Sequence, residues 1–331
     1  MAKEIETVSL DLIRDIRNHI GREEKQAELL KSLCKWLRLT SALDTLEDTS
    51  GAVQYYLDTE YPTSKNGAYL FTYGLLQALF VQMDAAKSIS ESLLETEVNF
   101  KAQYPMAYAV REMRDDVTGH PTVRRTRFHI YLAQCSLSKY SFYYIKENDE
   151  TGDYKSIDVD ISAAIKETSK CINSILGEAL DNLETEFKAY IEKHRERKMT
   201  KIFENLIYPK EKVMLDPAMA DWGYNATKNM VKKCEDELVL RYGAVDVMDS
   251  YKSLLDNIHE TYTLIDQAIP LVSQEYQDNM KKHLLQGLFR DLEELKGYCE
   301  ETDRYFENYG EEEHNCKTES TKVIIVDDLG K

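Results

Sequence analysis

The chain has 331 residues, of which 43% are hydrophobic and 31% are charged, and its formal net charge is -17 at pH 7. An acidic chain repels phosphate backbones at long range, so broad affinity for nucleic acid is not expected. Only 13 Gly and 6 Pro interrupt the sequence, which favours long helices over a sheet protein with many turns.

Cysteine usage and hydropathy indicate a reducing compartment and no contact with a membrane. The six cysteines are widely separated, which argues against a zinc site or a disulfide scaffold. The richest apolar window, 68–86, is interrupted by Gln77, Gln82 and Asp84, so we expect a buried helix there rather than a membrane span. Charged residues of both signs precede the first apolar positions, and no secretory signal is expected. We therefore expect a cytoplasmic protein.

Apolar positions recur with helical spacing over the first 120 residues. We expect helices at about 5–20, 23–47, 51–59, 67–94 and 99–117. The fourth is apolar almost all round, which is typical of the central helix of a bundle. The fifth is expected to pair with it as a helical hairpin.

Between residues 127 and 147 the apolar pattern changes from helical spacing to alternation. Phe128, Ile130 and Leu132 alternate with other residues, and a second run, 140–145, is rich in aromatic side chains. Both runs suit half-buried strands, so a two-stranded hairpin is expected at about 127–147.

A very long helix is expected from about 158 to 205, because apolar positions step mostly by four and three over its length. Such a helix spans roughly 70 Å, so it either bridges two subdomains or contributes to a dimer. It ends in a basic run, 193–198, that we expect to be solvated. A connector at 206–222 and three helices, about 223–241, 245–269 and 274–308, complete the expected elements.

These elements predict a mainly all-α protein, a helical bundle with one small β-hairpin insertion and a long bridging helix. The expected domains are the bundle at 1–205, a C-terminal helical region at 206–310 and a flexible acidic tail at 311–331 with a short strand-like segment. Asp256 and His259 suit a surface helix pair, and neither a metal site nor a cofactor is expected.

The segment 111–121, with the sequence REMRDDVTGHP, combines a fixed cation, Arg114, with a small acid, Asp115, and a titratable imidazole, His120. Three Arg and His pairs in the chain have four to six intervening residues, and about one is expected by chance, so the spacing alone has little weight. The other two pairs are Arg14 with His19 and Arg124 with His129.

Sequence context separates the three pairs. Arg14 and His19 lie on an amphipathic helix that has no helix before it, and Arg124 and His129 lie at the entry to a strand. Arg114 and His120 follow a long hydrophobic helix, and the Gly-His-Pro sequence at 119–121 ends their own helix. The alternative for Arg114 is a cation at a helix C-terminus with an ion pair to a neighbouring aspartate, Asp115 or Asp116.

Arg114, the polar Asp115 and His120 together resemble the signature of the HEPN (higher eukaryotes and prokaryotes nucleotide-binding) domains, an all-helical family with many metal-independent ribonucleases. The resemblance implies a homodimer whose two motifs share one composite cleft. His120 is then a general acid or base, Arg114 binds the scissile phosphate, and Asp115 orients one of them or lines the cleft. Toxin or defence roles and a protein partner such as an antitoxin are further expectations.

Arginines that flank the motif are the expected RNA-binding residues: Arg111, Arg124, Arg125 and Arg127. The other enzyme signatures are missing from the sequence, including a glycine-rich phosphate loop and a Gly-x-Ser-x-Gly motif. The rival hypothesis is a non-catalytic helical scaffold, or a module that binds a nucleotide or a protein. It is favoured by the acidic charge and by the C-terminal third, which the resemblance does not cover.

Overall fold

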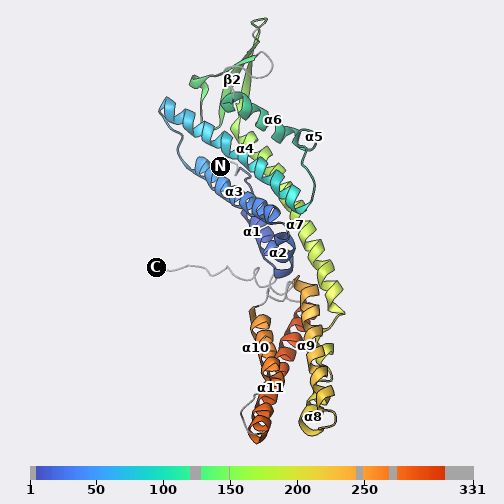
Figure 1. Cartoon of the computed structure of the whole chain (residues 1–331). Helices are drawn as coiled ribbons and strands as arrows, with labels where there is room; N and C mark the ends of the chain where they lie inside the picture. The colour runs from blue at the N-terminus through green and yellow to red at the C-terminus, as the bar shows by residue number, and fades with distance from the viewer. Residues whose placement is uncertain (1–4, 120–127, 149, 244–248, 268–273, 310–331) are drawn as a thin grey trace, which may run out of the picture. The chain divides into compact units, whose positions relative to one another are not determined.

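The structure, a computed structural model, describes residues 5–119, 128–148, 150–243, 249–267 and 274–309 (Figure 1). The described chain is mainly all-α with one small antiparallel sheet, as expected from the sequence. It divides into two compact units: unit 1 contains residues 1–25 and 29–185, and unit 2 contains residues 26–28 and 186–331. The division at residue 185 falls inside a continuous helix, α7 (Ile161–Arg195).

The helices of unit 1 before the sheet are α1 (Leu10–Ile20), α2 (Glu23–Leu30), α3 (Leu33–Asp58), α4 (Lys65–Leu93), α5 (Phe100–Gln103) and α6 (Pro105–Arg114). The expectation of one helix at 23–47 was wrong, because the Ser32 side chain accepts the Lys35 N–H and starts a new helix. The separate helix expected at 51–59 is instead the continuation of α3. Gly51 lies on the exposed face of that helix, where a glycine costs only about 1 kcal/mol.

The segment expected as one helix at 99–117 is interrupted twice. Tyr104 leaves the helical conformation before Pro105, as a residue before proline tends to do, and this separates α5 from α6. After Arg114 the chain continues as one turn of π-helix, η1 (Asp115–Gly119). The segment 111–121 therefore begins in an α-helix and continues in a π-helical turn.

The sheet has three antiparallel strands, β1 (Phe128–Leu132), β2 (Ser141–Asn148) and β3 (Tyr154–Asp160), in the order β1-β2-β3. The prediction of two strands missed β3, because most of that strand is polar and exposed. Phe142 of β2 pairs with Val159 of β3, and both are buried. In Figure 1 the sheet lies at one end of unit 1, beyond α6.

Two buried clusters fill unit 1, and α4 contributes to both, in agreement with its expected central place in the bundle. One cluster joins α1, α3, α4 and α7, with Ile16, Leu43 and Ile172 fully buried. The other joins α3, α4, the sheet and the start of α7, with Leu76 and Ile165 among its members. Val110 and Met113 of α6 belong to the same cluster, so the sheet and α6 share one core. No helix in the described residues is long and apolar enough to cross a membrane.

The described residues of unit 2 include the end of α7 and the helices η3 (Met199–Phe203), α8 (Ile207–Leu215), α9 (Ala220–Tyr242), α10 (Asp249–Asp266) and α11 (Gln274–Asn308). The connector expected at 206–222 was wrong, since most of it is α8. Pro209 is tolerated because it lies in the first turn of α8, where backbone N–H groups make no hydrogen bonds within the helix. A single buried cluster joins η3, α9, α10 and α11, as the neighbouring ribbons in Figure 1 indicate.

A buried group of charges links the end of α7 to α9 and α11. The Arg241 side chain is fully buried, with Nε 3.2 Å from Glu237 Oε1 and the guanidinium 4.8 Å from the Phe306 ring. Its Nη2 also donates to the carbonyl of Arg197. Asp303 accepts hydrogen bonds from the backbone N–H groups that begin η3, at 2.8 and 2.9 Å. The same group of contacts fixes three helices of unit 2.

The basic run at 193–198 is solvated only in part: Lys193, Arg197 and Lys198 are exposed as expected, but other residues of the run make buried or specific contacts. His194 is 1% exposed and lies in the buried group of charges. Arg195 donates to the carbonyl of Phe306, and Arg197 forms a 2.8 Å ion pair with Glu237. The run anchors α7 to α9 and α11, which the sequence of one helix cannot reveal.

His194 makes the stability of unit 2 depend on pH. Burial, with a smaller effect of the Arg241 guanidinium, lowers the pKa of His194 from 6.5 to about 4. Below pH 6.5 the unfolded chain binds a proton that the folded chain excludes, so this stability is complete above pH 6.5 and is lost as the pH falls to 4. We expect a loss on the order of 3 kcal/mol from this group, measured as the difference between wild type and His194→Gln in urea unfolding at pH 7 and pH 4. Equal pH dependence in the two proteins would contradict the assignment.

Candidate functional site

The candidate site is built where one face of α4 meets α6. Gln77, Phe80 and Asp84 follow one another at helical spacing on α4 and share a face of that helix. Arg111 and Arg114 lie one turn apart on α6 and contact these three side chains.

Phe80 is the shared platform for both arginines. The guanidinium carbon of Arg111 lies 4.1 Å from the centre of the Phe80 ring, and that of Arg114 lies 4.3 Å from it. Both distances are well inside the range of a cation-π contact. Because guanidinium groups are weakly hydrated and are attracted to aromatic rings, the Phe80 ring helps to position both cations. We call Phe80, Arg111, Arg114 and Asp115 the arginine site.

Arg114 is held by polar contacts on both sides. Its Nε lies 3.2 Å from Gln77 Oε1, its Nη2 also contacts that oxygen, and its Nη1 lies 2.9 Å from Asp115 Oδ1. The sequence offered Asp115 or Asp116 as the partner, and the structure shows Asp115. The Arg114 side chain is 20% exposed.

Arg111 forms a tighter ion pair. Its Nη1 lies 2.6 Å from Asp84 Oδ1, and the two side chains are 26% and 48% exposed. Asp84 belongs to α4, so this pair fixes α6 against α4 as well as neutralising Arg111. Arg114 differs in that its ion-pair partner, Asp115, is the next residue in the sequence and belongs to the π-helical turn.

The π-helical turn η1 is held from several elements. Tyr73 of α4 donates to the carbonyl of Val117 at 2.8 Å, and burial raises the pKa of Tyr73, which keeps its hydroxyl protonated as a donor. Thr118 donates to the carbonyl of Arg114 at 2.9 Å. Asp116 is 4% exposed and pairs at 3.2 Å with Lys146 of β2. These contacts explain how a rare π turn persists at this point of the chain.

Several of the residues that the sequence predicted lie outside the described part of the chain. They are His120, Arg124, Arg125 and Arg127. Arg111, Arg114 and Asp115 are described: the two arginines contact Phe80, and Asp115 pairs with Arg114. Their catalytic and RNA-binding roles remain predictions.

The competing spacing matches have different surroundings. The Arg14 side chain is 65% exposed on α1 and pairs with Asp11 at 2.9 Å, as suits the polar side of an amphipathic helix. His129 lies in β1, while its partner in the spacing, Arg124, is outside the described residues. His259 pairs with Glu235 of α9 at 2.6 Å rather than with Asp256, so this surface pair joins two helices.

Sequence reasoning missed the part of the site that α4 supplies. Gln77 and Asp84 were noticed as interruptions of an apolar window, although with Phe80 between them they mark one helix face. Tyr73 lies on the same face one turn earlier, and Lys146 comes from β2. The helical spacing of the α4 residues was a usable signal, but the contribution of Lys146 depends on tertiary contacts.

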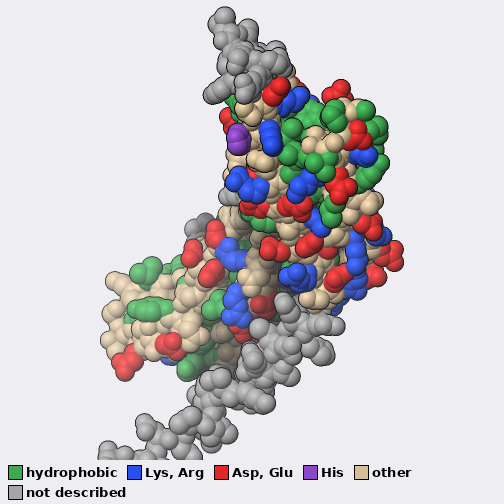
Figure 2. Space-filling view, turned by 90° about the horizontal axis from the view of Figure 1, so that it is seen from below, with side chains coloured by type: hydrophobic (Ala, Val, Ile, Leu, Met, Phe, Trp, Pro, Cys, Tyr) green, Lys and Arg blue, Asp and Glu red, His purple; other side chains and the backbone are tan. Residues whose placement is uncertain are grey.

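Charges at the site are balanced rather than strongly basic. Arg111 faces Asp84, Arg114 faces Asp115, and Lys146 faces Asp116. On the face of the molecule in Figure 2, Lys and Arg side chains are interspersed with Asp and Glu over the coloured surface, without an extended area of basic residues alone. An anion would therefore be bound by specific hydrogen bonds and not by a broad positive field.

Asp115 is the acidic partner of Arg114 at the arginine site. The Asp115 carboxylate accepts a hydrogen bond from Arg114 Nη1, a donor that phosphate oxygens also use in proteins. In the described residues, no group of three or more His, Cys, Asp or Glu side chains is placed to hold a metal ion.

Comparisons with protein-family profiles, with curated proteins and with solved structures find no match for this chain.

Proposed function

We propose that the chain is a HEPN-like, metal-independent endoribonuclease in which Arg114 binds the scissile phosphate and His120 is the general acid or base. The observation that carries the proposal is the π-helical turn that begins directly after Arg114 and ends at Gly119, the residue before His120 in the sequence. Single π turns in helical proteins occur frequently at functional sites, because they disturb regular hydrogen bonding and persist where they are useful.

The proposed reaction is an attack of the RNA 2'-oxygen on the adjacent phosphorus. A base removes the 2'-hydroxyl proton, the new bond from 2'-oxygen to phosphorus forms, and the bond from phosphorus to the 5'-oxygen breaks. The leaving 5'-oxygen takes a proton from an acid, and the products are a 2',3'-cyclic phosphate and a 5'-hydroxyl. His120 supplies one of these proton transfers, since an imidazole titrates near neutral pH.

Arg114 is suited to the phosphate because its guanidinium is oriented before substrate binds. Phe80 contacts the guanidinium and Gln77 accepts a hydrogen bond from Nε, so Asp115 is the partner that a phosphate oxygen would replace. A preoriented cation stabilises the extra negative charge of the pentacoordinate phosphorus. Asp115 then keeps Arg114 in place until the substrate binds.

The assembly and the setting belong to the same proposal. Two copies of the chain would contribute their arginine sites to one cleft, RNA is the substrate, and a toxin or defence role with a controlling protein partner is consistent with the resemblance. A cytoplasmic location is part of this proposal.

Product analysis on a defined RNA tests the chemistry. We expect cleavage in the presence of EDTA that leaves 2',3'-cyclic phosphate ends, measured by mass spectrometry of the fragments. The same sequence with 2'-O-methyl groups should remain intact, because its nucleophile is blocked. Cleavage of the methylated strand, or products that end in a 5'-phosphate, would contradict this mechanism.

The second candidate is a non-catalytic helical scaffold or binding module. It is favoured by the satisfied contacts of Arg111 and Arg114 and by unit 2, which has a buried core of its own. Under this alternative, the arginine site holds α4 against α6 and cleaves nothing. Intact RNA after incubation with the folded protein would support it.

A further inference from the structure

Two buried cysteines of unit 2 lie side by side, although 65 positions separate them in the sequence. The Sγ atoms of Cys234, on α9, and Cys299, on α11, are 3.8 Å apart. Both side chains are fully buried in the core of unit 2. The sulfur atoms of a disulfide are about 2.0 Å apart, so an approach of about 2 Å would join this pair covalently.

The two helices are held together next to the cysteines by contacts that do not involve sulfur. The guanidinium of Arg241 on α9 lies 4.8 Å from the Phe306 ring on α11, and its Nη2 lies 4.0 Å from Asp303 Oδ1. Arg241 and Phe306 each follow the cysteine of their own helix by seven residues, about two helical turns. The helices therefore run in the same direction here, and their packing brings the two sulfur atoms together.

Burial determines when the two thiols can react. The hydrogen bond with Cys299, together with burial, raises the pKa of Cys234, so the reactive thiolate is disfavoured while the core is closed. Reaction with a reagent in solution therefore requires a transient opening of unit 2, of the kind that folded proteins undergo locally. When the core closes again, the same packing returns the two sulfur atoms to contact.

We propose that Cys234 and Cys299 form a reversible disulfide between α9 and α11 when unit 2 opens in the presence of a small disulfide such as oxidised glutathione. One cysteine, as a thiolate, attacks a sulfur of oxidised glutathione, so that a mixed disulfide forms and one glutathione thiolate leaves. The second cysteine, as a thiolate, attacks the protein sulfur of the mixed disulfide, and the second glutathione thiolate leaves. The two cysteine protons pass to the glutathione thiolates. Two protein thiols are thereby oxidised, and one glutathione disulfide is reduced to two thiols.

The packing of unit 2 favours the second step. Because the two sulfur atoms are held in contact, their reaction is intramolecular and has a high effective concentration. The other described cysteines, Cys34, Cys135 and Cys171, belong to unit 1. In a reducing compartment the pair remains as two thiols, so the bond makes the stability of unit 2 depend on the thiol-disulfide balance. This inference does not depend on the proposed RNA cleavage.

Peptide mapping tests the bond. We would incubate the full chain with reduced and oxidised glutathione, alkylate the remaining thiols and digest the protein without reduction. A cross-linked peptide that contains Cys234 and Cys299 is expected in mass spectrometry. It should form faster in urea just below the unfolding transition than in buffer, because opening limits the reaction. The proposal is overturned if, under both conditions, the two cysteines are recovered as free thiols or separate glutathione adducts, or if either is joined to Cys316.

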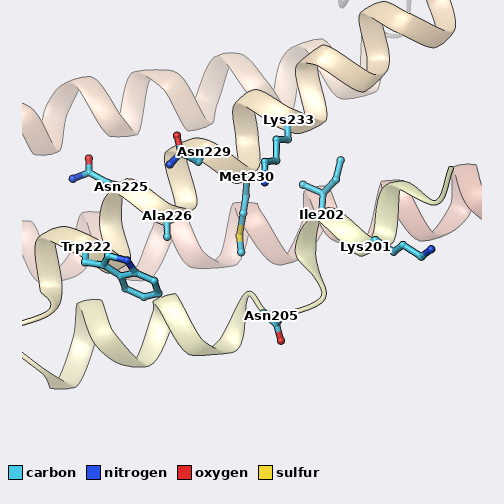
Figure 3. A pocket seen from close by; sticks show the side chains of 9 residues that line it. All are labelled: Lys201, Ile202, Asn205, Trp222, Asn225, Ala226, Asn229, Met230 and Lys233. Atoms are coloured by element: carbon cyan, nitrogen blue, oxygen red, sulfur yellow. The ribbon is translucent and has the colours of Figure 1, made fainter.

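Urea unfolding measures what the bond does to unit 2. The chain has two tryptophans, and Trp36→Phe leaves Trp222 as the reporter. Trp222 points toward α8 in Figure 3, and its ring centre lies 5.5 Å from that of Tyr208. The disulfide should raise the urea midpoint of unit 2 by about 1 M or more, since it closes a long loop in the unfolded chain. Dithiothreitol should reverse the shift.

Cysteine variants in the same background complete the test. Cys234→Ala should show neither the cross-link nor the shift, whereas Cys171→Ala, at a buried cysteine of unit 1, should show both. Should Cys234→Ala fail to fold, the reversal by dithiothreitol tests the same point in a protein that keeps both cysteines. A cross-linked protein that unfolds at the same urea concentration before and after reduction would contradict the proposal.

Discussion

Replacing Arg241 with alanine is expected to lower the free energy of unfolding of unit 2 by about 3 to 5 kcal/mol, the usual cost of removing one partner from a buried charge network. The Arg241 side chain is fully buried between Glu237 and Phe306, and it also contacts the Arg197 carbonyl. Without it, Glu237 would keep its contact with Arg197 but lose its fully buried partner. The contacts that join the end of α7 to α9 would also weaken, because Arg241 no longer binds the Arg197 carbonyl.

Urea unfolding of the full chain measures this effect, with Trp222 in the Trp36→Phe background as the reporter of unit 2. Arg290→Ala is the matched control, because Arg290 is 79% exposed and pairs only with neighbouring Asp291 in the described contacts. That control should change the free energy of unfolding by about 0 to 1 kcal/mol. Equal unfolding curves for the two alanine variants would show that the buried group of charges does not stabilise unit 2.

The second large effect concerns RNA cleavage. Arg114→Ala is expected to lower the cleavage rate by about 100- to 1,000-fold, the usual loss when one preoriented group that stabilises transition-state charge is removed. Arg114→Lys should recover only part of the rate. Lysine keeps the charge, but it lacks the planar group and the paired hydrogen bonds of a guanidinium.

Arg14→Ala is the control for this loss. Arg14 is also followed by an aspartate and has a histidine nearby in the sequence, but its side chain is exposed on α1. Its removal should leave the rate unchanged, and circular dichroism should show the same helicity in both variants. Wild-type cleavage by folded Arg114→Ala would contradict the proposed role of Arg114.

Local patterns in the sequence predicted the helices well and their interruptions less well. The spacing of apolar residues located α4, α9 and α11 to within a few residues. It did not locate the break before α3, which depends on a serine cap, or the break at Pro105, which was inside an otherwise helical pattern. Propensity and periodicity average over many residues, whereas a cap or a proline acts at one position.

Contacts between elements were beyond the reach of sequence patterns. The contact of Arg111 and Arg114 with one ring requires Phe80 of α4 to face α6. The same holds in unit 2, where His194 and Arg241 belong to different helices and meet only in the folded chain. The sequence could identify the residues with useful chemistry, and the structure determines which of them meet.

The most direct test of the central claim is a double-mutant cycle on RNA cleavage with Arg114→Ala, His120→Ala and the double variant. If Arg114 and His120 act in one site, each single variant should lose most of the activity and the double variant should lose little more, because residues that act as a unit are strongly non-additive. The measurement is the single-turnover rate on a defined RNA, with circular dichroism and oligomeric state as controls for folding. Wild-type rates in all three folded variants would contradict the claim.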